Sequence, residues 1–327
     1  MKRYAHIVGT GSQTPKRVLT NADIEKMVDT SDEWITSRSG IKERHIVSDN
    51  EASSDLASAA AVKALAAAGI DASAIDLIIL ATVTPDKPLP STACFVQENI
   101  GAVNAAAMDI VAACSGFVYG LSLARGVVET GQANNVLVIG VEVLSRVTNW
   151  KDRNTCVLFG DGAGAAVVQG SDTPGGILGT YMKSNGSLWH LLNIPGGGYR
   201  MPIDESNMNN GSRYIQMAGP EVYKNAVRAM EEAGIEALKR TGLRGEDITL
   251  FIPHQANIRI IESTADKLDI SMDKVFVNIH KYGNTSAASI PIALDEAIRS
   301  GRLKKKDKAL MVAFGAGFTW GSAVVEI

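Results

Sequence analysis

Two stretches of the chain repeat the same order of parts, and this repetition constrains the fold more than any other feature. Gly131 follows Cys114 at the same distance at which Gly301 follows Asn284, and a helical pattern fills each interval. Each glycine is followed by an apolar run and then by Gly-rich sequence and a last strand pattern. The apolar runs cover 136–139 and 310–313, and the last strands cover 165–168 and 322–325. The same order of parts twice indicates a duplicated α/β unit.

Helical and strand patterns alternate along the chain, which favours a layered α/β architecture with helices covering sheets. We expect two domains, 1–174 and 175–327, each one copy of the unit. Helices are expected over 21–28, 53–68, around 97, and over 115–130, 221–239, 257–268 and 286–299. Strands are expected over 5–8, 77–83, 105–111, 136–141, 163–169, 250–252, 275–279, 309–314 and 322–326. Ser53 or Ser54 should cap the second helix and Gly69 should end it, and 195–212 reads as a loop.

Two glycine-rich runs resemble nucleotide-binding loops but lack their full patterns. The run 9–14 is followed by Pro15 and opens no helix, so it is a poor dinucleotide-binding sequence. The run 160–164 lacks the Gly-Lys-Ser/Thr end of a phosphate-binding loop. We expect both runs to form tight turns.

Charge and cysteine content exclude several function classes. The net charge of −3 gives no general attraction to nucleic acid or to anionic membranes. The apolar run 77–83 is too short to span a bilayer. The three cysteines have no metal-type spacing and suit a reducing compartment. We therefore expect a cytoplasmic protein without a metal site.

Cys114 lies at the junction of an apolar strand and a helix, in the run 109–117. Unpaired backbone N–H groups and the positive end of the helix dipole favour the thiolate there, and the thiolate is the nucleophile. A free cysteine is also often just a small buried hydrophobic residue. From the local pattern alone, the two interpretations are equally supported.

His254 and Asn284 are the candidate partners of Cys114. His254 lies between the end of a strand and a helix, where it can reach a cleft, and His280 is its one serious rival. Asn284 precedes a helix, where capping would by itself explain an asparagine. If the two copies are related by a pseudo-two-fold axis, the helix starts after Cys114 and near Asn284 face a common cleft. The set of three then favours chemistry over packing.

The chain is similar to the β-ketoacyl-acyl carrier protein synthase III family, the initiating condensing enzymes of type II fatty acid synthesis. The matching segments are 111–117, 253–257, 283–289, 32–35, 159–166 and 314–322. They cover nearly the whole chain in the expected order. The resemblance implies the thiolase-like fold, with two duplicated α/β halves forming a five-layered α-β-α-β-α sandwich. It also implies a homodimer that needs no cofactor.

The resemblance also implies the reaction. Cys114 would take the acyl group of a short acyl-CoA, releasing CoA. Malonyl-acyl carrier protein would then lose carbon dioxide, and His254 and Asn284 would donate hydrogen bonds to the resulting enolate. The carbanion would attack the acyl-Cys114 carbonyl, whose oxyanion would lie against the backbone N–H groups of Cys114 and Gly317.

The family's binding residues carry over to further positions. Trp34 and Arg38 are similar to the pair that grips the adenine end of CoA. Further expected CoA contacts are Arg153, Tyr223 and Asn257, and expected docking residues for the acidic carrier protein are Arg259, Lys224 and Lys267. Leu89 stands where some members have a phenylalanine that shapes the acyl pocket from the partner subunit, so the identity of the primer stays open.

Three other functions remain as alternatives. A cysteine hydrolase uses the same residue types, with Asn orienting His, and needs neither CoA nor a carrier protein. A related condensing or acyl-transfer enzyme of secondary metabolism would share the three residues but use another acceptor. A non-enzymatic scaffold is the weakest alternative, because three motifs converge on one cleft.

Overall fold

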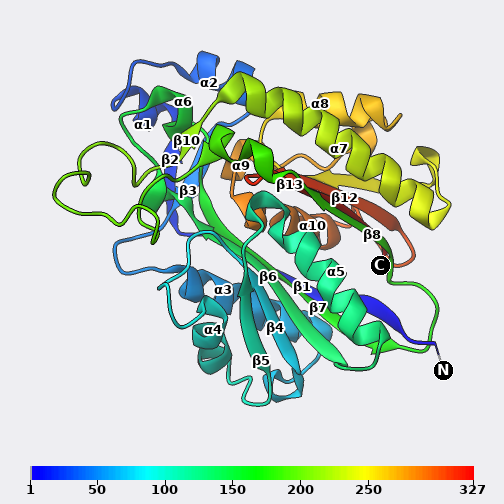
Figure 1. Ribbon diagram of the computed structural model, residues 1–327. Coiled ribbons are helices and arrows are strands. Elements are labelled where there is room, and N and C mark those ends of the chain that lie inside the picture. The colour runs from blue at the N-terminus through cyan, green and yellow to red at the C-terminus, as the bar shows by residue number, and fades with distance from the viewer. Residues whose placement is uncertain (1) are drawn as a thin grey trace.

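The computed structural model describes residues 2–327 and contains two central sheets (Figure 1). The first sheet has five strands in the order β1-β7-β6-β4-β5 and the second has four in the order β11-β12-β13-β8. The strands of the first are β1 (Tyr4–Gln13), β7 (Asp161–Ser171), β6 (Asn135–Val143), β4 (Leu77–Ala81) and β5 (Ala106–Ile110). Those of the second are β11 (Leu250–Pro253), β12 (Lys308–Gly315), β13 (Thr319–Glu326) and β8 (Ile177–Ser184).

Helices fill three layers around the two sheets (Figure 1). The outer helices on the first sheet are α3 (Ser53–Ala68) and α4 (Thr92–Ile100), and those on the second are α7 (Gly219–Thr241) and α8 (Ile258–Lys267). The central layer contains α5 (Gly116–Glu129) and α10 (Ser289–Arg299). Three apolar cores fill the spaces between these layers. The predicted five-layered, thiolase-like sandwich is therefore confirmed.

The two sheets are built in the same way. In the first, β4 pairs in parallel with β6, and the antiparallel strands β7 and β1 follow. In the second, β11 pairs in parallel with β12, and the antiparallel strands β13 and β8 follow. This matching order supports the proposed division into 1–174 and 175–327.

Smaller elements lie at the end of the sandwich where the site is found. They are β2 (Arg17–Thr20), β3 (Glu43–Ile46), α1 (Asn21–Glu25), α2 (Asp32–Ser39), α6 (Arg153–Cys156), α9 (Ile279–Tyr282), β9 (Leu192–Asn193) and β10 (Gln216–Met217). Residues 195–212 form the predicted loop, which projects from the body of the molecule (Figure 1). Within residues 2–327, no helix is long and apolar enough to cross a membrane.

The two glycine-rich runs are strands, so their prediction as tight turns is wrong. Gly9 and Gly11 lie in β1, where a Cβ would collide with the backbone of α3. Gly164 lies in β7, where a Cβ would meet the backbone of α10 at 2.7 Å. The glycines let helices lie directly on the strands.

Two local predictions also need correction. The segment 275–279 is not a full strand, because only Val275 pairs, in a single bridge with Phe251, and α9 then begins. The N-cap of α3 is Ala52, and its backbone N–H is bonded by the Asp55 carboxylate at 2.8 Å. The Ser53 hydroxyl instead donates to Thr84 O, at 2.6 Å.

One glycine in each half lies against the turn that precedes the central helix of the other half. The 3₁₀ turn η7 (Ser286–Ala288), just before α10, lies on β6, and a Cβ on Gly140 would strike the carbonyl of Ala287. The turn η2 (Ala113–Ser115), just before α5, lies on β12, and a Cβ on Gly315 would lie 2.6 Å from Cys114 N. The starts of the two central helices therefore meet between the halves.

Candidate active site

Cys114 lies in the turn η2, directly before α5. Ala113, the residue before it, has a φ of 46°, which is unusual for a residue with a Cβ and turns the chain sharply into the helix. The thiol is part of the wall of two cavities, of about 230 and about 250 Å³. Cys114 is therefore accessible from two sides, as a nucleophile that holds one substrate while meeting another must be.

Five of the predicted site residues line the first cavity, of about 230 Å³. Cys114, His254 and Asn284 all line it, although they are far apart in the sequence. Tyr223 and Asn257 line the same cavity, along the outer helices α7 and α8. The cavity is thus a channel that joins the surface of these helices to the thiol.

His254 directly follows β11 and is only 2% exposed. Its Nδ1 lies 2.7 Å from the Ser289 hydroxyl, which also accepts the Gln255 N–H at 3.4 Å. When the hydroxyl accepts that N–H and donates its own proton to Nδ1, Nε2 carries the ring hydrogen. Burial lowers the pKa of His254 to about 3, so the ring is a neutral hydrogen-bond donor.

The backbone N–H and the backbone carbonyl of Asn284 are both hydrogen-bonded to the segment before β7. Its N–H donates to Leu158 O at 2.8 Å, and its carbonyl accepts the Gly160 N–H at 3.0 Å. The side-chain Oδ1 accepts the Ser286 N–H at 2.9 Å, so the Nδ2 amide is the donor left for another partner. Asn284 is not a helix cap, because the N-cap of η7 is Thr285 and that of α10 is Ala288; its bond to Ser286 closes a turn before η7 and uses only one end of the amide.

The equal spacing in the sequence does not make Asn284 the structural counterpart of Cys114. The residue with the unusual backbone before α10 is Ser286, with a φ of 47°, which matches Ala113 before α5. By backbone position, Cys114 therefore corresponds to Ala287, and Asn284 lies further upstream. Cys114 and Asn284 therefore occupy different places relative to the turn that the two halves share.

Burial raises the pKa of the Cys114 thiol to about 12. A hydrogen bond with the Ser286 hydroxyl lowers the pKa in part, and the charge of Glu142 raises it further. The predicted lowering at the helix start is therefore outweighed by desolvation. In the free protein Cys114 is a thiol, and its proton must leave when the sulfur attacks.

Glu142 is the one ionisable residue of the site that sequence reasoning missed. Its carboxyl is completely buried at the end of β6 and accepts the Ser286 hydroxyl at 3.1 Å. Burial raises its pKa to about 7. The sequence did contain a signal for this residue, because Glu142 directly follows the apolar run 136–141 of a central strand.

The second cavity is apolar and runs from Cys114 away from His254. The side chains around it are Val83, Leu144, Phe159, Leu192, Ile194 and Ile215. Leu89 does not line this cavity in its own chain, where it is 83% exposed. An acyl group on the sulfur would lie among these apolar side chains.

Trp34, Arg38 and Arg153 form a stack near the outer end of the channel. The guanidinium of Arg153 lies 4.1 Å from the centre of the Trp34 ring, and that of Arg38 lies 5.0 Å from it. The Asn257 amide donates to Arg38 O at 2.9 Å, which ties the stack to the channel wall. The structure thus brings the predicted CoA residues together beside the entrance.

The remaining predicted residues lie around this region. Arg259, Lys224 and Lys267 are exposed on α8 and α7, and Arg259 Nη2 donates to Ser37 O at 3.1 Å. Gly317 lies in the turn between β12 and β13, whose Gly315 and Ala316 line the cavities at Cys114. Among residues 2–327, no group of three or more His, Cys, Asp or Glu could hold a metal ion.

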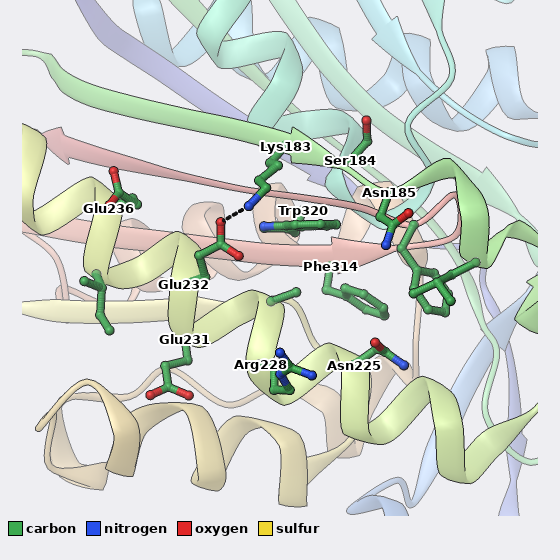
Figure 2. A pocket seen from close by; sticks show the side chains of 14 residues that line it. Lys183, Ser184, Asn185, Asn225, Arg228, Glu231, Glu232, Glu236, Phe314 and Trp320 are labelled. Atoms are coloured by element: carbon green, nitrogen blue, oxygen red, sulfur yellow. Dashed lines mark hydrogen bonds and ion pairs between the residues drawn. The ribbon is translucent and has the colours of Figure 1, made fainter.

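A larger hollow, of about 670 Å³, lies on the other side of α7 (Figure 2). Its charges are mixed, and Lys183 and Glu232 form an ion pair of 2.7 Å across it. None of Cys114, His254 and Asn284 lines it, and Phe314 separates it from the channel by lining both. The reactive groups therefore belong to the smaller cavities.

Comparison with known proteins agrees with this geometry. A family model described as 3-oxoacyl-[acyl-carrier-protein (ACP)] synthase III matches residues 108–186, and the model of its C-terminal part matches residues 238–327. The chain is 57% identical to beta-ketoacyl-[acyl-carrier-protein] synthase III of Caldanaerobacter subterraneus subsp. tengcongensis, over 99% of this chain and 98% of that protein. It is 53% identical to the protein of that name from Roseiflexus castenholzii, over 100% and 99%. The crystal structure of 3-oxoacyl-[acyl-carrier-protein] synthase III from Aquifex aeolicus matches with a TM-score of 0.92 and 52% identity, over 99% of this chain and 100% of that one.

Proposed function

The chain belongs to the β-ketoacyl-acyl carrier protein synthase III family, and from this premise we propose how its own residues perform the family's reaction. The protein is a condensing acyltransferase that initiates fatty acid synthesis. The full-length identity of 57% favours this function over a cysteine hydrolase or a scaffold. The observation that supports the residue roles is the meeting of Cys114, His254 and Asn284 in one cavity.

In the first half of the reaction, Cys114 attacks the thioester carbonyl of an acyl-CoA. The acyl group moves to the sulfur, and CoA leaves through the channel. The oxyanion formed during the attack lies against the backbone N–H groups of Cys114 and Gly317. The acyl chain extends into the apolar cavity, where Phe159 and Ile215 contact it.

In the second half, malonyl-acyl carrier protein enters the emptied channel. Carbon dioxide leaves, and the negative charge moves to the thioester oxygen of the enolate. His254 Nε2–H and Asn284 Nδ2–H donate to this oxygen, and both are neutral donors that neither lose nor gain a proton. The carbanion then attacks the acyl-Cys114 carbonyl and releases the sulfur. The chemistry uses CoA as part of a substrate and needs no metal or redox cofactor.

The test separates the two half-reactions. Wild-type protein with acetyl-CoA or isobutyryl-CoA and malonyl-acyl carrier protein should release carbon dioxide and form β-ketoacyl product. Cys114→Ala should form no acyl-enzyme. His254→Ala and Asn284→Ala should still become acylated, as seen by intact mass, but should lose decarboxylation by about 10²-fold or more. Wild-type condensation rates in either of these two variants would contradict the enolate role.

The size of the apolar cavity supports primers larger than acetyl. Its volume of about 250 Å³ leaves room beside the sulfur for an acyl group larger than acetyl. We therefore expect isobutyryl-CoA to be used as well as acetyl-CoA. Ile215→Phe, which narrows the cavity, should lower kcat/KM for isobutyryl-CoA at least tenfold more than for acetyl-CoA. Equal losses for both primers would argue against this cavity as the acyl pocket.

We assign CoA binding to the stack at the entrance and to the channel wall. The adenine end lies at Trp34, with Arg38 and Arg153 near the phosphates, and the pantetheine chain passes Tyr223 and Asn257. The acidic carrier protein docks beside the same entrance, on the exposed cations of α8 and α7. These are Arg259, Lys224 and Lys267.

The edge of the first sheet supports a homodimer. Strand β5 has a neighbour on only one side and is flanked by exposed apolar side chains, with Met108 39% and Val111 79% exposed. Pairing of β5 with its copy would cover this edge. In that dimer we expect Leu89 of one subunit to close the acyl pocket of the other.

A further inference from the structure

We propose that Glu142 accepts the proton of the Cys114 thiol through the Ser286 hydroxyl while Cys114 is acylated, and returns it when the sulfur is released. This inference rests on the proposed acyl-Cys114 reaction and adds a proton path to it. It gives a role to a completely buried carboxyl that the condensation chemistry does not otherwise use.

The Ser286 hydroxyl lies between the sulfur and the carboxyl. Cys114 and Ser286 line the same cavity, on the contacting turns η2 and η7, and the Ser286 hydroxyl donates to Glu142 Oε1 at 3.1 Å. On its other side the carboxyl is held by the Thr84 hydroxyl at 2.7 Å and by the Val83 N–H at 3.1 Å. The Thr82 hydroxyl also reaches Oε2, at 3.3 Å.

The second observation is that, within residues 2–327, no cation pairs with this buried carboxyl. The groups that face the carboxyl are the hydroxyls of Thr82, Thr84 and Ser286 and the N–H of Val83. The Cys114 thiol lies beyond Ser286 and belongs to the turn η2. A buried carboxylate without an ion pair carries a large desolvation cost, which taking up a proton removes. Such a group is suited to receiving a proton from a neighbour.

His254 is not available for this task. Its Nδ1 is occupied by Ser289, and its Nε2 carries the hydrogen that the enolate needs. A ring that accepted the thiol proton would also become a buried cation, which the surroundings strongly disfavour. The path through Ser286 therefore leaves His254 unchanged throughout the cycle.

The proton transfers balance over the cycle. As the sulfur attacks the acyl-CoA carbonyl, the S–H proton passes to Ser286 Oγ and the Ser286 proton passes to Glu142, while the departing CoA thiolate takes a proton from water. When the carbanion later displaces the sulfur from the acyl group, Glu142 gives its proton to Ser286 Oγ and Ser286 gives its own to the sulfur. The carboxylate, the hydroxyl and the thiol are then all restored.

The decisive variant is Glu142→Gln, which keeps the size and hydrogen bonding of the side chain but cannot accept the proton. Single-turnover acylation by acetyl-CoA, followed by intact mass from pH 5.5 to 9, should rise with pH through about 7 in the wild type. In the variant the rate should fall about 10²-fold at pH 8 and lose this rise. Ser286→Ala, which breaks the path but keeps the carboxyl, should show the same loss.

Two controls separate a proton path from a structural role. Thr84→Val removes a hydrogen bond to the carboxyl without touching the path, so acylation should persist with its rise moved to higher pH. In the second control, Glu142→Gln protein is acetylated to completion, freed of CoA and mixed with malonyl-acyl carrier protein. Carbon dioxide release should then proceed within about threefold of wild type, because decarboxylation precedes the return of the proton to the sulfur and uses only His254 and Asn284.

The outcomes distinguish the two proposals. Glu142→Gln that acylates at the wild-type rate with the wild-type pH profile would overturn the proton path. So would equal losses in acylation and in carbon dioxide release from the preformed acetyl-enzyme, because they would mean a distorted site. Failure of the wild-type acetyl-enzyme to condense would instead count against the proposed function.

Discussion

Ser289 is the hydrogen-bond partner of His254 Nδ1. Its hydroxyl lies between the Gln255 N–H and Nδ1, and donation of its proton to the ring places the ring hydrogen on Nε2. In the same way, the Ser286 N–H holds Asn284 Oδ1 and so leaves Nδ2 as the donor. At the scale of single residues, neighbouring hydrogen bonds orient His254 and Asn284, which can each donate or accept, so that both present a donor to the cavity.

Removing the Ser289 hydroxyl should let the His254 ring adopt the other tautomer, with the hydrogen on Nδ1. For Ser289→Ala we expect acylation of Cys114 to remain within about threefold of wild type. Decarboxylation should fall by about 10-fold to 10²-fold, because one enolate donor is lost for part of the time. Stopped-flow acylation and carbon dioxide release measure the two rates, and equal changes in both would contradict the tautomer argument.

His254 and Glu142 change stability with pH in opposite directions. Burial lowers the pKa of His254 from 6.5 to about 3, so the unfolded chain binds more protons in that window and acid destabilises the fold there. Burial raises the pKa of Glu142 from 4.5 to about 7, so the folded protein binds more protons and loses stability as the pH rises through that window. The two effects oppose each other between pH 4.5 and 6.5.

Glu142→Gln should remove one of these two effects. Relative to wild type, we expect its free energy of unfolding to increase by about 3 kcal/mol between pH 4.5 and 7, at about 1.4 kcal/mol for each pKa unit. Urea unfolding at several pH values measures the difference. Replacing the exposed Glu98 by Gln is the matched control and should leave the pH dependence unchanged. Parallel curves for wild type and Glu142→Gln would show that burial does not shift this carboxyl.

At the scale of elements, glycines in strands set how closely the layers approach. Gly140 in β6 lets the turn η7 lie on the strand, and Gly315 in β12 does the same for η2. These two turns contain Ser286 and Cys114, so the glycine contacts also fix the distance between the nucleophile and the residues of the other half. An added methyl group at either place would have to move a catalytic turn.

Gly140→Ala should therefore cost both stability and activity. Its Cβ would meet the Ala287 carbonyl, and overpacking of this kind destabilises by about 1–3 kcal/mol. Gly126→Ala in the last turn of α5 is the matched control, because outside the helix's own backbone no atom lies within 4 Å of the new Cβ. That variant should gain about 0.4–1 kcal/mol. Urea unfolding and kcat distinguish them, and equal behaviour of the two variants would contradict the close-packing argument.

At the scale of the whole molecule, the exposed edge of β5 predicts assembly. Met108→Asp combined with Val111→Asp should place charges on this edge and give a monomer. Light scattering should then report half the wild-type mass, and kcat/KM for isobutyryl-CoA should fall as the partner's contribution to the acyl pocket is lost. Val62→Asp, at an exposed valine of α3, is the control that should stay dimeric. A wild-type protein that is already monomeric would overturn this assignment.

The sequence was sufficient to predict the architecture and the meeting of Cys114, His254 and Asn284 in one cavity, because periodicity, duplication and family motifs are local signals. It was not sufficient for features that depend on what packs opposite a residue. The glycines of β1 and β7 resembled turn residues, since the helices that require them are distant in the chain. The raised pKa of Cys114 and the role of Ser289 depend on burial and on contacts across the two halves. Glu142 was missed for the same reason.

The stack of Arg153 and Arg38 on Trp34 has a practical consequence for measurement. An adenine ring that stacks on the Trp34 indole takes the place of the Arg153 or Arg38 guanidinium. The binding of CoA therefore changes which group lies against the fluorescent indole. The emission of Trp34, one of four tryptophans in the chain, should therefore change when CoA enters. The protein then carries its own optical reporter of substrate entry, and a stopped-flow fluorescence trace can time the arrival of CoA separately from the chemistry at the sulfur.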